Sequence, residues 1–484
     1  MSDRLTVEPA PSTGRAGIDT LDEIHEIART AYRLYSERID RRRRLRRTYL
    51  AELVRYARHY VEPGSRVLEI GVGTGDLLAS LAASRAVGVD VSPEMLEVAR
   101  ANHPELELHA MAGEDLGPLE GPFDYVVMSD LTILLHDILG VLRQVRRLCH
   151  ARTRLVFSFH SRLWQPVLTM LSALGLHHSQ ARTNWVTFED LANLLRLAGY
   201  DVVHTDRGTL CPGPVPVASW IANRFLVRLP GIRHGALVNW VVARPRLPVE
   251  VEDVTVVCPC RNEAGNVPDI VRRVPRLGRR TELLFVEGGS SDGTWEAIQR
   301  EVQNPGRDDL ELRAVRQDGR GNAEARGGLF LILDADLTVA PEALLDFVSV
   351  VRDGLGEMVI GSRLVYPMRD EAMRFLNMLG NKFFARVFSA LLGQTIKDTL
   401  CGTKVLLRSD YERLARGRTY FGDFDPFGDF DLLFGAAKLN LQIVEIPVRY
   451  GARTYGETNI RRFRDGWLLL QMSWLALRRL RFFA

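Results

Sequence analysis

The strongest constraint on this chain is the distance in sequence between two motifs, each of which follows an apolar run. Residues 67–76 (VLEIGVGTGD) set three glycines after a run typical of a buried strand, and residues 331–336 (LILDAD) set two carboxylates after another. About 260 residues separate the motifs, which is too far for one small domain. A chain of 484 residues with 46% hydrophobic content is long enough for two or three domains. The sequence therefore predicts two globular domains with different chemistries.

Strand-like and helix-like segments alternate twice along the chain, which favours parallel sheets flanked by helices. Between the two series, residues 245–253 (PRLPVEVED) read as an extended linker. We expect an α/β chain of two domains, residues 1–248 with a helical extension over 20–60, and residues 249–484. The predicted strands are 66–70, 86–91, 107–111, 123–129, 153–160 and 237–243, followed by 254–259, 282–287, 311–316 and 329–334.

The composition of the chain limits the cellular compartment and the classes of partner that we expect. The formal net charge is +3, so no overall field attracts nucleic acid, and we expect no nucleic-acid partner. The five cysteines are not spaced like zinc ligands, and they indicate a protein of the reducing cytoplasm. Residues 1–22 are polar and lack the apolar core of a signal peptide. No run of 18 apolar residues occurs, which predicts no transmembrane helix.

The glycine motif suits a nucleoside ligand. Gly71, Gly73 and Gly75 separate a predicted strand from a predicted helix over 76–84, and the missing β-carbons let the backbone turn sharply and approach a ligand. The spacing is GxGxG rather than the GxGxxG of dinucleotide binders. The next strand ends in Asp90, whose carboxylate can accept hydrogen bonds from both hydroxyls of a ribose. Asp115 follows the third strand, where an adenine amino group can be bound.

These residues resemble the class I S-adenosylmethionine-dependent methyltransferases over roughly residues 45–243. The resemblance implies a Rossmann-like fold with S-adenosylmethionine as cofactor, held by Glu69, Gly71, Gly73, Gly75, Asp90, Gly113 and Asp115. It also places acceptor-side groups after the strand 123–129, so Asp130 and His136 are candidates for a general base on an acceptor hydroxyl. Because methyl transfer from a sulfonium relies on positioning, such a base is optional. A purely structural role is the alternative for His136.

The carboxylate motif suits a bound divalent cation. Residues 254–263 (VTVVCPCRNE) and 283–294 (LLFVEGGSSDGT) each lead from an apolar strand into a polar loop, and Asp334 and Asp336 follow a third strand. Two carboxylates at a strand end can share a hard cation such as Mg²⁺ or Mn²⁺, which can also bridge a diphosphate. Alone, such a pair is most often a solvated turn. Its place behind two strand–loop segments favours a site for a cation that bridges a diphosphate.

From residue 254 to about 465 the chain resembles glycosyltransferase family 2, and most closely the polyprenyl-phosphate (dolichol-phosphate-mannose synthase-like) sugar transferases. The resemblance implies a GT-A fold, a nucleotide-sugar donor and a polyprenyl-phosphate or glycolipid acceptor. It makes Asp334 and Asp336 the metal ligands. Glu287 stands where many members of the family carry Asp. The implied donor-binding residues are Pro259, Asn262, Glu263, Glu287, Asp292 and Asp334.

Acceptor-side residues follow from the same resemblance. Asp398 lies in a matching segment, and a phosphate clamp would be made by Arg449, Arg453 and Thr458. Inverting transfer needs a base for an acceptor hydroxyl, or only an electrostatic partner when the acceptor is an anionic phosphate. Asp429 is the first candidate for this role and Asp431 the second. A strand at this point would put both side chains on one face.

The segment before the strand that ends in the carboxylate pair departs from the family, and it leaves two interpretations of the second domain. Members carry a helix of about two turns, near 10 Å in length, before the strand that ends in the carboxylate pair. Here residues 319–328 (GRGNAEARGG) run almost directly into Leu329. With an adapted loop, the chain is a bifunctional methyl- and glycosyltransferase that serves one pathway, such as cell-surface glycan assembly. With a damaged donor site, the second domain is a non-catalytic glycan- or lipid-binding module beside an active methyltransferase.

Two segments bear on membrane contact. Residues 467–483 combine apolar bulk, two tryptophans and arginines. An amphipathic helix packed on its own domain is one interpretation, and peripheral binding at the inner face of the membrane is the other. The arginine run over 41–47 is either a solvated helix face or a contact for anionic lipid or a phosphorylated substrate.

Overall fold

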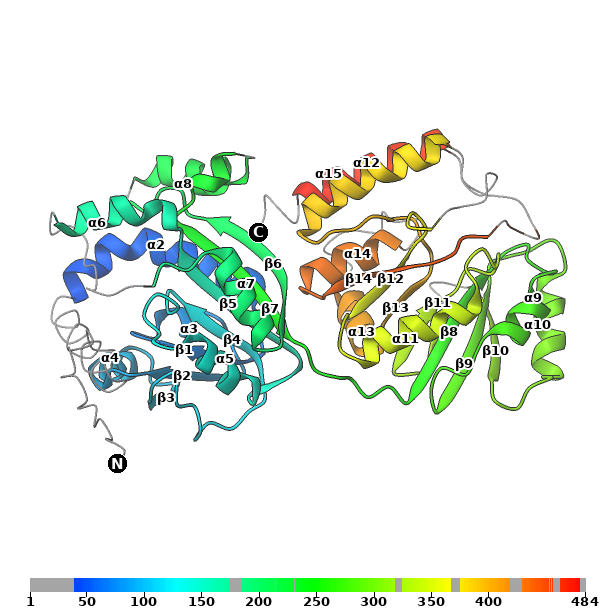
Figure 1. Cartoon of the computed structure of the whole chain (residues 1–484), viewed down its shortest axis with the longest axis horizontal. Helices are drawn as coiled ribbons and strands as arrows, with labels where there is room; N and C mark the ends of the chain where they lie inside the picture. Colours follow the sequence, from blue (N-terminus) through cyan, green and yellow to red (C-terminus); the bar gives the residue numbers. More distant parts are fainter. Residues whose placement is uncertain are drawn as a thin grey trace, which may run out of the picture.

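The computed structural model describes residues 39–173, 184–317, 324–366, 375–417, 429–451 and 462–478, without Pro214 and Pro230, together with Arg453 and Tyr455. These residues form two mixed α/β sheets of seven strands each, which lie side by side (Figure 1). The chain leaves the first sheet at Pro245 and enters the second at Asp253. The connecting segment includes residue 248, where the sequence places the domain boundary.

The first sheet has the strand order β3-β2-β1-β4-β5-β7-β6. Strand β7 runs antiparallel to both of its neighbours, whereas the other pairs are parallel. Its strands are β1 (Arg66–Ile70), β2 (Arg85–Asp90), β3 (Glu107–Ala110), β4 (Phe123–Ser129), β5 (Cys149–His160), β6 (Tyr200–Gly208) and β7 (Val238–Pro245). The helices around it are α2 (Ile39–Tyr60), α3 (Asp76–Ala79), α4 (Pro93–Asn102), α5 (Ile138–Arg146), α6 (Gln165–Ala173), α7 (Phe188–Leu197) and α8 (Pro216–Arg224).

The second sheet has the strand order β10-β9-β8-β11-β13-β12-β14, and only β13 runs antiparallel to its neighbours among these strands. Its strands are β8 (Asp253–Cys260), β9 (Arg280–Glu287), β10 (Glu311–Arg316), β11 (Leu329–Ile332), β12 (Met358–Ser362), β13 (Lys404–Leu407) and β14 (Ile443–Pro447). The helices around it are α9 (Val267–Arg273), α10 (Thr294–Gln303), α11 (Leu344–Arg352), α12 (Phe375–Leu392), α13 (Arg408–Arg416), α14 (Asp429–Lys438) and α15 (Arg462–Ala476).

The central strands of each sheet are buried on both faces. Successive residues of a strand point to opposite faces, and in β1 Val67 and Leu68 are both fully buried, each in a different apolar cluster. Val256 and Val257 divide in the same way in β8. Burial of a side chain of this size stabilises a fold by about 1.5–3 kcal/mol. Because the central strands are parallel, the polar residues that follow them meet at one edge of each sheet.

The structure corrects two expectations from the sequence and describes only part of a third. The helix expected over 76–84 ends at Ala79, because the chain turns at Ala82, which has a φ of 50°. Asp429 and Asp431 lie in the first turn of helix α14 rather than in a strand, so positions two residues apart no longer share a face. Of the helix expected over 20–60, the structure describes the part from Ile39 onwards, and residues 1–38 lie outside the described residues.

Four strands are not identifiable from apolar runs. β6 and β14 lie at the edges of their sheets and mix polar with apolar residues. β13 is only four residues long and begins with the buried Lys404, whose ammonium donates to the carbonyl oxygen of Cys401 at 2.6 Å. β12 is the short run Met358–Ser362. Tertiary pairing rather than local pattern therefore decides these strands.

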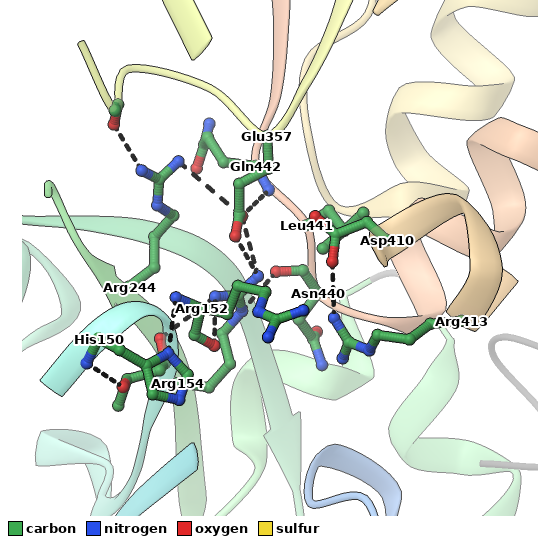
Figure 2. A network of polar contacts seen from close by, with 12 residues as sticks. His150, Arg152, Arg154, Arg244, Glu357, Asp410, Arg413, Asn440, Leu441 and Gln442 are labelled. Carbon is green, nitrogen blue, oxygen red and sulfur yellow. Dashed lines mark hydrogen bonds and ion pairs between the residues drawn. The ribbon is translucent and has the colours of Figure 1, made fainter. Parts of the chain in front are cut away.

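A buried ionic network joins the two domains. Arg154 of β5 donates hydrogen bonds of 2.8 Å to both carboxylate oxygens of Glu357, the residue before β12 (Figure 2). It also donates one of 2.8 Å to the carbonyl oxygen of Asn440. Arg244 of β7 lies 3.8 Å from the same carboxylate, and the backbone N–H of Gln442 donates to it at 2.9 Å. The network links β5 and β7 of the first sheet to the second domain.

Helices α12 and α15 pack against each other on one side of the second domain (Figure 1). Helix α15 buries Met472 and Ala476 and exposes Trp467 and Trp474. One face of this C-terminal helix therefore packs on its own domain, and the other faces outward. Within the described part of the chain, no helix combines the length and the apolar composition needed to cross a bilayer.

Candidate active sites of the two domains

The glycine motif forms a tight turn between β1 and α3. Gly71, Gly73 and Gly75 have φ values of 77°, 54° and 78°, which L-residues with side chains rarely adopt. A β-carbon on Gly71 would lie 2.7 Å from the side chain of Leu131. Over Gly73, by contrast, the nearest atom to an added β-carbon is the terminal carbon of Met95 at 3.6 Å. The turn therefore leaves room beside Gly73 for a ligand.

Two buried carboxylates flank this turn. Asp90, at the end of β2, accepts hydrogen bonds of 2.9 Å from the backbone N–H groups of Gly73 and Ser92. Burial raises the pKa of Asp90, although these backbone donors oppose the shift. Glu69 of β1 is 2% exposed, burial raises its pKa well above the usual value, and its Oε2 has no hydrogen-bond partner among the described residues. Glu69 therefore keeps one buried carboxylate oxygen without a donor next to the glycine turn.

A cavity lies beside the turn, at the edge where β1, β2 and β4 end. Its lining brings together four of the residues predicted from the sequence, namely Gly71, Asp90, Gly113 and His136. Glu114 also lines it and accepts a hydrogen bond of 3.1 Å from the backbone N–H of His136. Asp115 is exposed and does not line the cavity. Of the two residues predicted to flank the adenine, Gly113 therefore lines the cavity, together with Glu114.

A second cluster lies beside this cavity and comes from three distant segments. Tyr49 of α2 donates a hydrogen bond of 2.6 Å from its hydroxyl to Asp130 Oδ2, and the same hydroxyl lies 3.1 Å from His160 Nε2. His160 Nε2 lies 3.8 Å from Asp130 Oδ1. Asp130 follows strand β4, and His160 ends the adjacent strand β5. Leu131, the next residue after Asp130, lines the cavity. This arrangement can accept a proton from a bound acceptor.

Of the two acceptor-side residues predicted from the sequence, Asp130 belongs to this cluster. His136 is exposed and lines the cavity beside Glu114 instead. Tyr49 and His160 are not identified by sequence analysis. The position of His160 at the end of the predicted strand 153–160 was the available signal, because it falls at the same sheet edge as Asp130. Nothing in the sequence of α2 marks Tyr49.

In the second domain, the loops after β8 and β9 are tied together. Asn262, which has a φ of 58°, accepts a hydrogen bond of 2.9 Å on Oδ1 from the backbone N–H of Ser291. Asp292 accepts one of 3.2 Å from the N–H of Ala264. Burial would raise the pKa of Asp292, but hydrogen bonds from Thr294, Ala264 and Tyr455 outweigh it and lower the pKa. The two loops predicted to hold the nucleotide thus form one preorganised surface.

The carboxylate pair lies beyond the end of β11, next to Arg453. Asp336 Oδ1 accepts a hydrogen bond of 2.7 Å from the hydroxyl of Thr338, and its Oδ2 accepts one of 2.8 Å from Arg453. Arg453 also lies 3.3 Å from Oε1 of Glu263. Burial raises the pKa of Glu263, and the charge of Arg453 opposes that shift. Three residues predicted from distant motifs therefore meet at one point.

The fit to a divalent cation rests on Asp334 and Asp336. Among the described residues no group of three or more His, Cys, Asp or Glu side chains is arranged to hold a metal ion. Two carboxylates are nevertheless a suitable protein contribution, because Mg²⁺ sites of this kind use one or two carboxylates together with substrate phosphates and water. A β-carbon on Gly402 would lie 2.2 Å from Asp334 Oδ2, so glycine leaves the space that this carboxylate occupies.

Asp398 is buried, and its carboxylate is engaged within the domain. Arg363 donates to it through two nitrogens at 2.7 and 2.8 Å, and Asn381 donates at 2.9 Å. Burial alone would raise the pKa of Asp398, but Arg363 and the hydrogen bonds lower it. The guanidinium of Arg363 lies 5.1 Å from the ring centre of Tyr450. In this structure Asp398 orients Arg363.

The remaining acceptor-side predictions are only partly described. Arg449 is exposed, and its guanidinium lies over the ring of Tyr366 at 4.9 Å. Asp431 is half-buried in α14. The side chain of Asp429, residue Thr458 and the loop residues 318–323 lie outside the described residues. Pro259 is an exposed residue near the end of β8, and Glu287 ends β9, where its carboxylate accepts a hydrogen bond of 2.5 Å from the N–H of Ser290.

Comparisons with known proteins assign each half of the chain. Residues 41–205 match the family model described as "Methyltransferase domain", and residues 255–415 match "Glycosyl transferase family 2". Glycosyltransferase AglJ of Haloferax volcanii is 26% identical over 45% of this chain and 69% of its own length. The dolichol-phosphate mannosyltransferase of Pyrococcus furiosus is 27% identical over 43% of this chain and 59% of its own length. The matches thus span 59% to 69% of the length of these two relatives.

A solved structure of a SAM-dependent methyltransferase from Thermotoga maritima is 19% identical, with a TM-score of 0.35, and covers 45% of this chain and 100% of its own. The family assignments agree with the two seven-stranded sheets and with the strand-end motifs that each sheet carries. The chain therefore joins an N-terminal methyltransferase domain to a C-terminal glycosyltransferase family 2 domain.

Proposed function

We propose that the chain is a bifunctional transferase of glycan or glycolipid assembly at the cytoplasmic side of a membrane. The first domain transfers a methyl group from S-adenosylmethionine to an acceptor hydroxyl. The second domain transfers a sugar from a nucleotide donor to a polyprenyl phosphate or a glycolipid precursor. The transfer inverts the anomeric centre and uses a divalent cation bound at the donor site. The relatives named as glycosyltransferase AglJ and dolichol-phosphate mannosyltransferase support the second assignment.

In the first domain, Gly73 and Asp90 would bind the ribose, and Gly113 and Glu114 would flank the adenine. When bound, S-adenosylmethionine supplies an electrophilic methyl group on a sulfonium. Asp130 and His160 would hold the acceptor hydroxyl in line with that methyl group and receive its proton as the new carbon–oxygen bond forms. Tyr49 orients both, because its hydroxyl contacts each of them.

In the second domain, the loops around Asn262 and Asp292 would hold the nucleoside part of the donor. Asp334 and Asp336 would hold Mg²⁺ or Mn²⁺, which supplies charge neutralisation for the leaving diphosphate. Arg453 lies beside Asp336 and would bind a phosphate group of donor or acceptor. Asp429 or Asp431 would deprotonate an acceptor hydroxyl, whereas an anionic phosphate acceptor needs no base.

The observation that carries the proposal is that, at an edge of each sheet, candidate site residues from distant segments lie close together. The cavity at Asp90 adjoins the Tyr49–Asp130–His160 cluster, and Asp336 adjoins Glu263 and Arg453. The test is a donor panel. Purified protein is incubated with UDP- and GDP-sugars, undecaprenyl phosphate and Mn²⁺, and separately with S-adenosylmethionine and the resulting glycolipid. Turnover in both assays supports the proposal, and none in either contradicts it.

The contact of Arg453 with Asp336 favours a second candidate, in which the glycosyltransferase domain only binds a glycan or lipid. A guanidinium paired with both Asp336 and Glu263 already neutralises charge where a cation would otherwise act. The two candidates differ in metal dependence. Sugar transfer that requires Mn²⁺ and is lost in Asp336→Ala rejects the binding-module interpretation. Glycolipid binding that is unaffected by Mn²⁺ or by Asp336→Ala, without turnover, supports it.

A further inference from the structure

The methyltransferase domain carries an apolar surface that its own core does not use. It is formed by residues 163–170, in η1 (Arg162–Trp164) and α6, and by residues 215–232, from α8 to η3 (Ile232–Gly235), and is called here the α6–α8 surface. Half of the exposed large apolar side chains in the described part of the chain belong to it. Five of them are more than half exposed, and Val217 at 72%, Leu163 at 68% and Trp220 at 59% are the most exposed of these.

Helix α8 is amphipathic, but its polar face is buried and its apolar face is exposed, which is the opposite of a usual surface helix. Its buried face holds Ser219 and Asn223, which are 3% and 1% exposed. Both are paired: Ser219 donates to the carbonyl oxygen of Gly213 at 2.7 Å, and Asn223 exchanges hydrogen bonds of 2.9 and 3.0 Å with the backbone of Cys211. The helix therefore turns its polar side inward and its apolar side outward. Such an outward apolar face indicates a partner.

The surface is held firmly to the domain. The indole N–H of Trp164, at the end of η1, donates to the carbonyl oxygen of Gly235 at 2.9 Å and so links the two segments. Below η2 (Leu226–Arg228), Arg228 forms an ion pair of 2.8 Å with Asp206, and both side chains are less than a tenth exposed. Val227, which precedes Arg228 in η2, is also buried. The exposed apolar side chains thus stand on an ordered base.

The charges around the surface favour an anionic partner. Between Asp206 and Glu250 the sequence has no acidic residue, whereas it has several arginines, among them Arg224 and Arg233 beside the apolar side chains. Arg233 lies 3.5 Å from Asp206, which already pairs with Arg228, so the arginines here outnumber the carboxylate. Apolar and aromatic side chains mixed with arginine are typical of helices that lie in the headgroup region of a bilayer. A second copy of the chain is a poorer partner, because a two-fold contact would place arginines against arginines.

The surface borders the acceptor side of the methyltransferase site and lies on the same side of the molecule as helices α12 and α15 of the second domain (Figure 1). His160 ends β5, and η1 and α6 follow it directly. Helix α15 exposes Trp467, Leu470 and Trp474, and α6, α8, α12 and α15 all lie along one side of the molecule (Figure 1). The buried contact of Arg154 with Glu357 joins the two domains in this arrangement (Figure 2).

We propose that the α6–α8 surface docks on an anionic phospholipid bilayer, from which the methyltransferase domain takes a lipid-linked acceptor. The proposed docking depends only on the α6–α8 surface, whereas the proposed acceptor class depends on the proposed function. A bilayer covers Val217, Trp220 and their neighbours, pairs its phosphates with the arginines, and brings the headgroup zone to the edge where His160 and α6 meet. Both active sites then work on molecules carried in one membrane.

Docking is tested by co-sedimentation of the full-length protein with phosphatidylcholine vesicles that contain or lack phosphatidylglycerol. The variant is Val217→Glu with Trp220→Glu. The matched control is Leu197→Glu on α7, which alters a side chain that is 55% exposed outside the surface. Trp467→Glu with Trp474→Glu reports on α15. We expect the α8 variant to lower the partition coefficient at least tenfold on phosphatidylglycerol vesicles, Leu197→Glu to leave it unchanged, and vesicles to protect residues 215–232 from hydrogen exchange.

Three results overturn the docking. They are a wild-type protein that does not bind phosphatidylglycerol vesicles, binding that only the α15 variant reduces, and a dimer in sedimentation velocity that protects 215–232 without vesicles. Thermal unfolding of each variant checks the fold. Binding is measured without S-adenosylmethionine or donor, so failure of the proposed function leaves this readout unchanged.

For the acceptor class, methyl transfer to undecaprenyl-phosphate hexose in vesicles should exceed transfer to hexose 1-phosphate at least tenfold. Equal transfer to the two acceptors contradicts the proposed acceptor class.

Discussion

Arg154 and Glu357 face each other through two hydrogen bonds of 2.8 Å, although they belong to different domains and are 203 positions apart in the sequence. Their side chains are 2% and 6% exposed. A buried pair of this kind is weak evidence for added stability, because desolvation offsets the attraction, but the loss of one partner leaves an uncompensated charge. The contact therefore makes the relative position of the two domains sensitive to either residue.

Replacing Glu357 with Gln should destabilise the protein by about 3–5 kcal/mol, because Arg154 and the nearby Arg244 remain buried without a counter-charge. The measurement is the free energy of unfolding in urea, followed by tryptophan fluorescence. Glu412→Gln is the matched control, since its contact with Arg408 is on the surface, where such pairs contribute about 0–1 kcal/mol. Equal effects of the two substitutions would show that the buried network does not hold the domains.

The same carboxylate predicts a pH dependence. Burial would raise the pKa of Glu357, but the charges of Arg154 and Arg244 outweigh it and lower the pKa. Its contribution to stability is therefore complete above the unfolded pKa, about 4.3, and is lost as pH falls through the lower folded pKa. The difference in unfolding free energy between wild type and Glu357→Gln should stay constant from pH 7 to about pH 5 and shrink below it. A difference that grows on acidification would have the wrong sign.

His160 should contribute to the methyl-transfer step, whereas His136 should contribute to cofactor binding. Removing a general base typically lowers kcat by about 10²–10⁴-fold, so His160→Gln should lower kcat at least tenfold with little change in S-adenosylmethionine affinity. His136→Gln should weaken that affinity instead, because His136 lines the cavity beside Glu114. Steady-state kinetics and calorimetry separate the two effects. An unchanged pH–rate profile in His160→Gln would remove it from the mechanism.

Arg453 should compete with the cation at Asp336. Its guanidinium pairs with Asp336 and Glu263, so Arg453→Ala should lower the Mn²⁺ concentration needed for half-maximal activity and raise the KM for the sugar nucleotide. Arg272→Ala is the control, because Arg272 is an exposed arginine of helix α9 whose carboxylate partner, Asp269, is not a predicted site residue. Metal titrations of sugar transfer measure both constants. If the metal dependence of Arg453→Ala matched that of wild type, the ion pair with Asp336 would have no role at the donor site.

Local motifs account for the parts of the sites that the sequence could predict. Gly73 and Asp90 lie 17 residues apart in one strand–turn–helix–strand unit, so their hydrogen bond follows from a short pattern. The parallel order of the strands then brings Asp130 to the same edge. The sequence also predicts that Asp334 and Asp336 follow a strand, because an apolar run of this length between polar residues favours one.

Contacts between distant segments account for what the sequence could not predict. Tyr49 meets Asp130 across 81 positions and His160 across 111, and no periodicity in α2 distinguishes this tyrosine from its neighbours. Asp398 resembles an acceptor-side residue in sequence, but only the fold shows that Arg363 engages it. The segment around Asp429 reads as a strand because its apolar residues are few and closely spaced, whereas packing against the second sheet's core makes it helix α14.

The most direct measurement of the central claim, that one chain holds two separate transferase sites, is a paired assay of Asp90→Asn and Asp336→Ala. Both variants are assayed for methyl transfer and for Mn²⁺-dependent sugar transfer in the same vesicles. Asp90→Asn should lose methyl transfer at least tenfold and keep sugar transfer, and Asp336→Ala should do the reverse. If either variant lost both activities while remaining folded, or if Asp336→Ala retained full sugar transfer, the account of two independent sites would be contradicted.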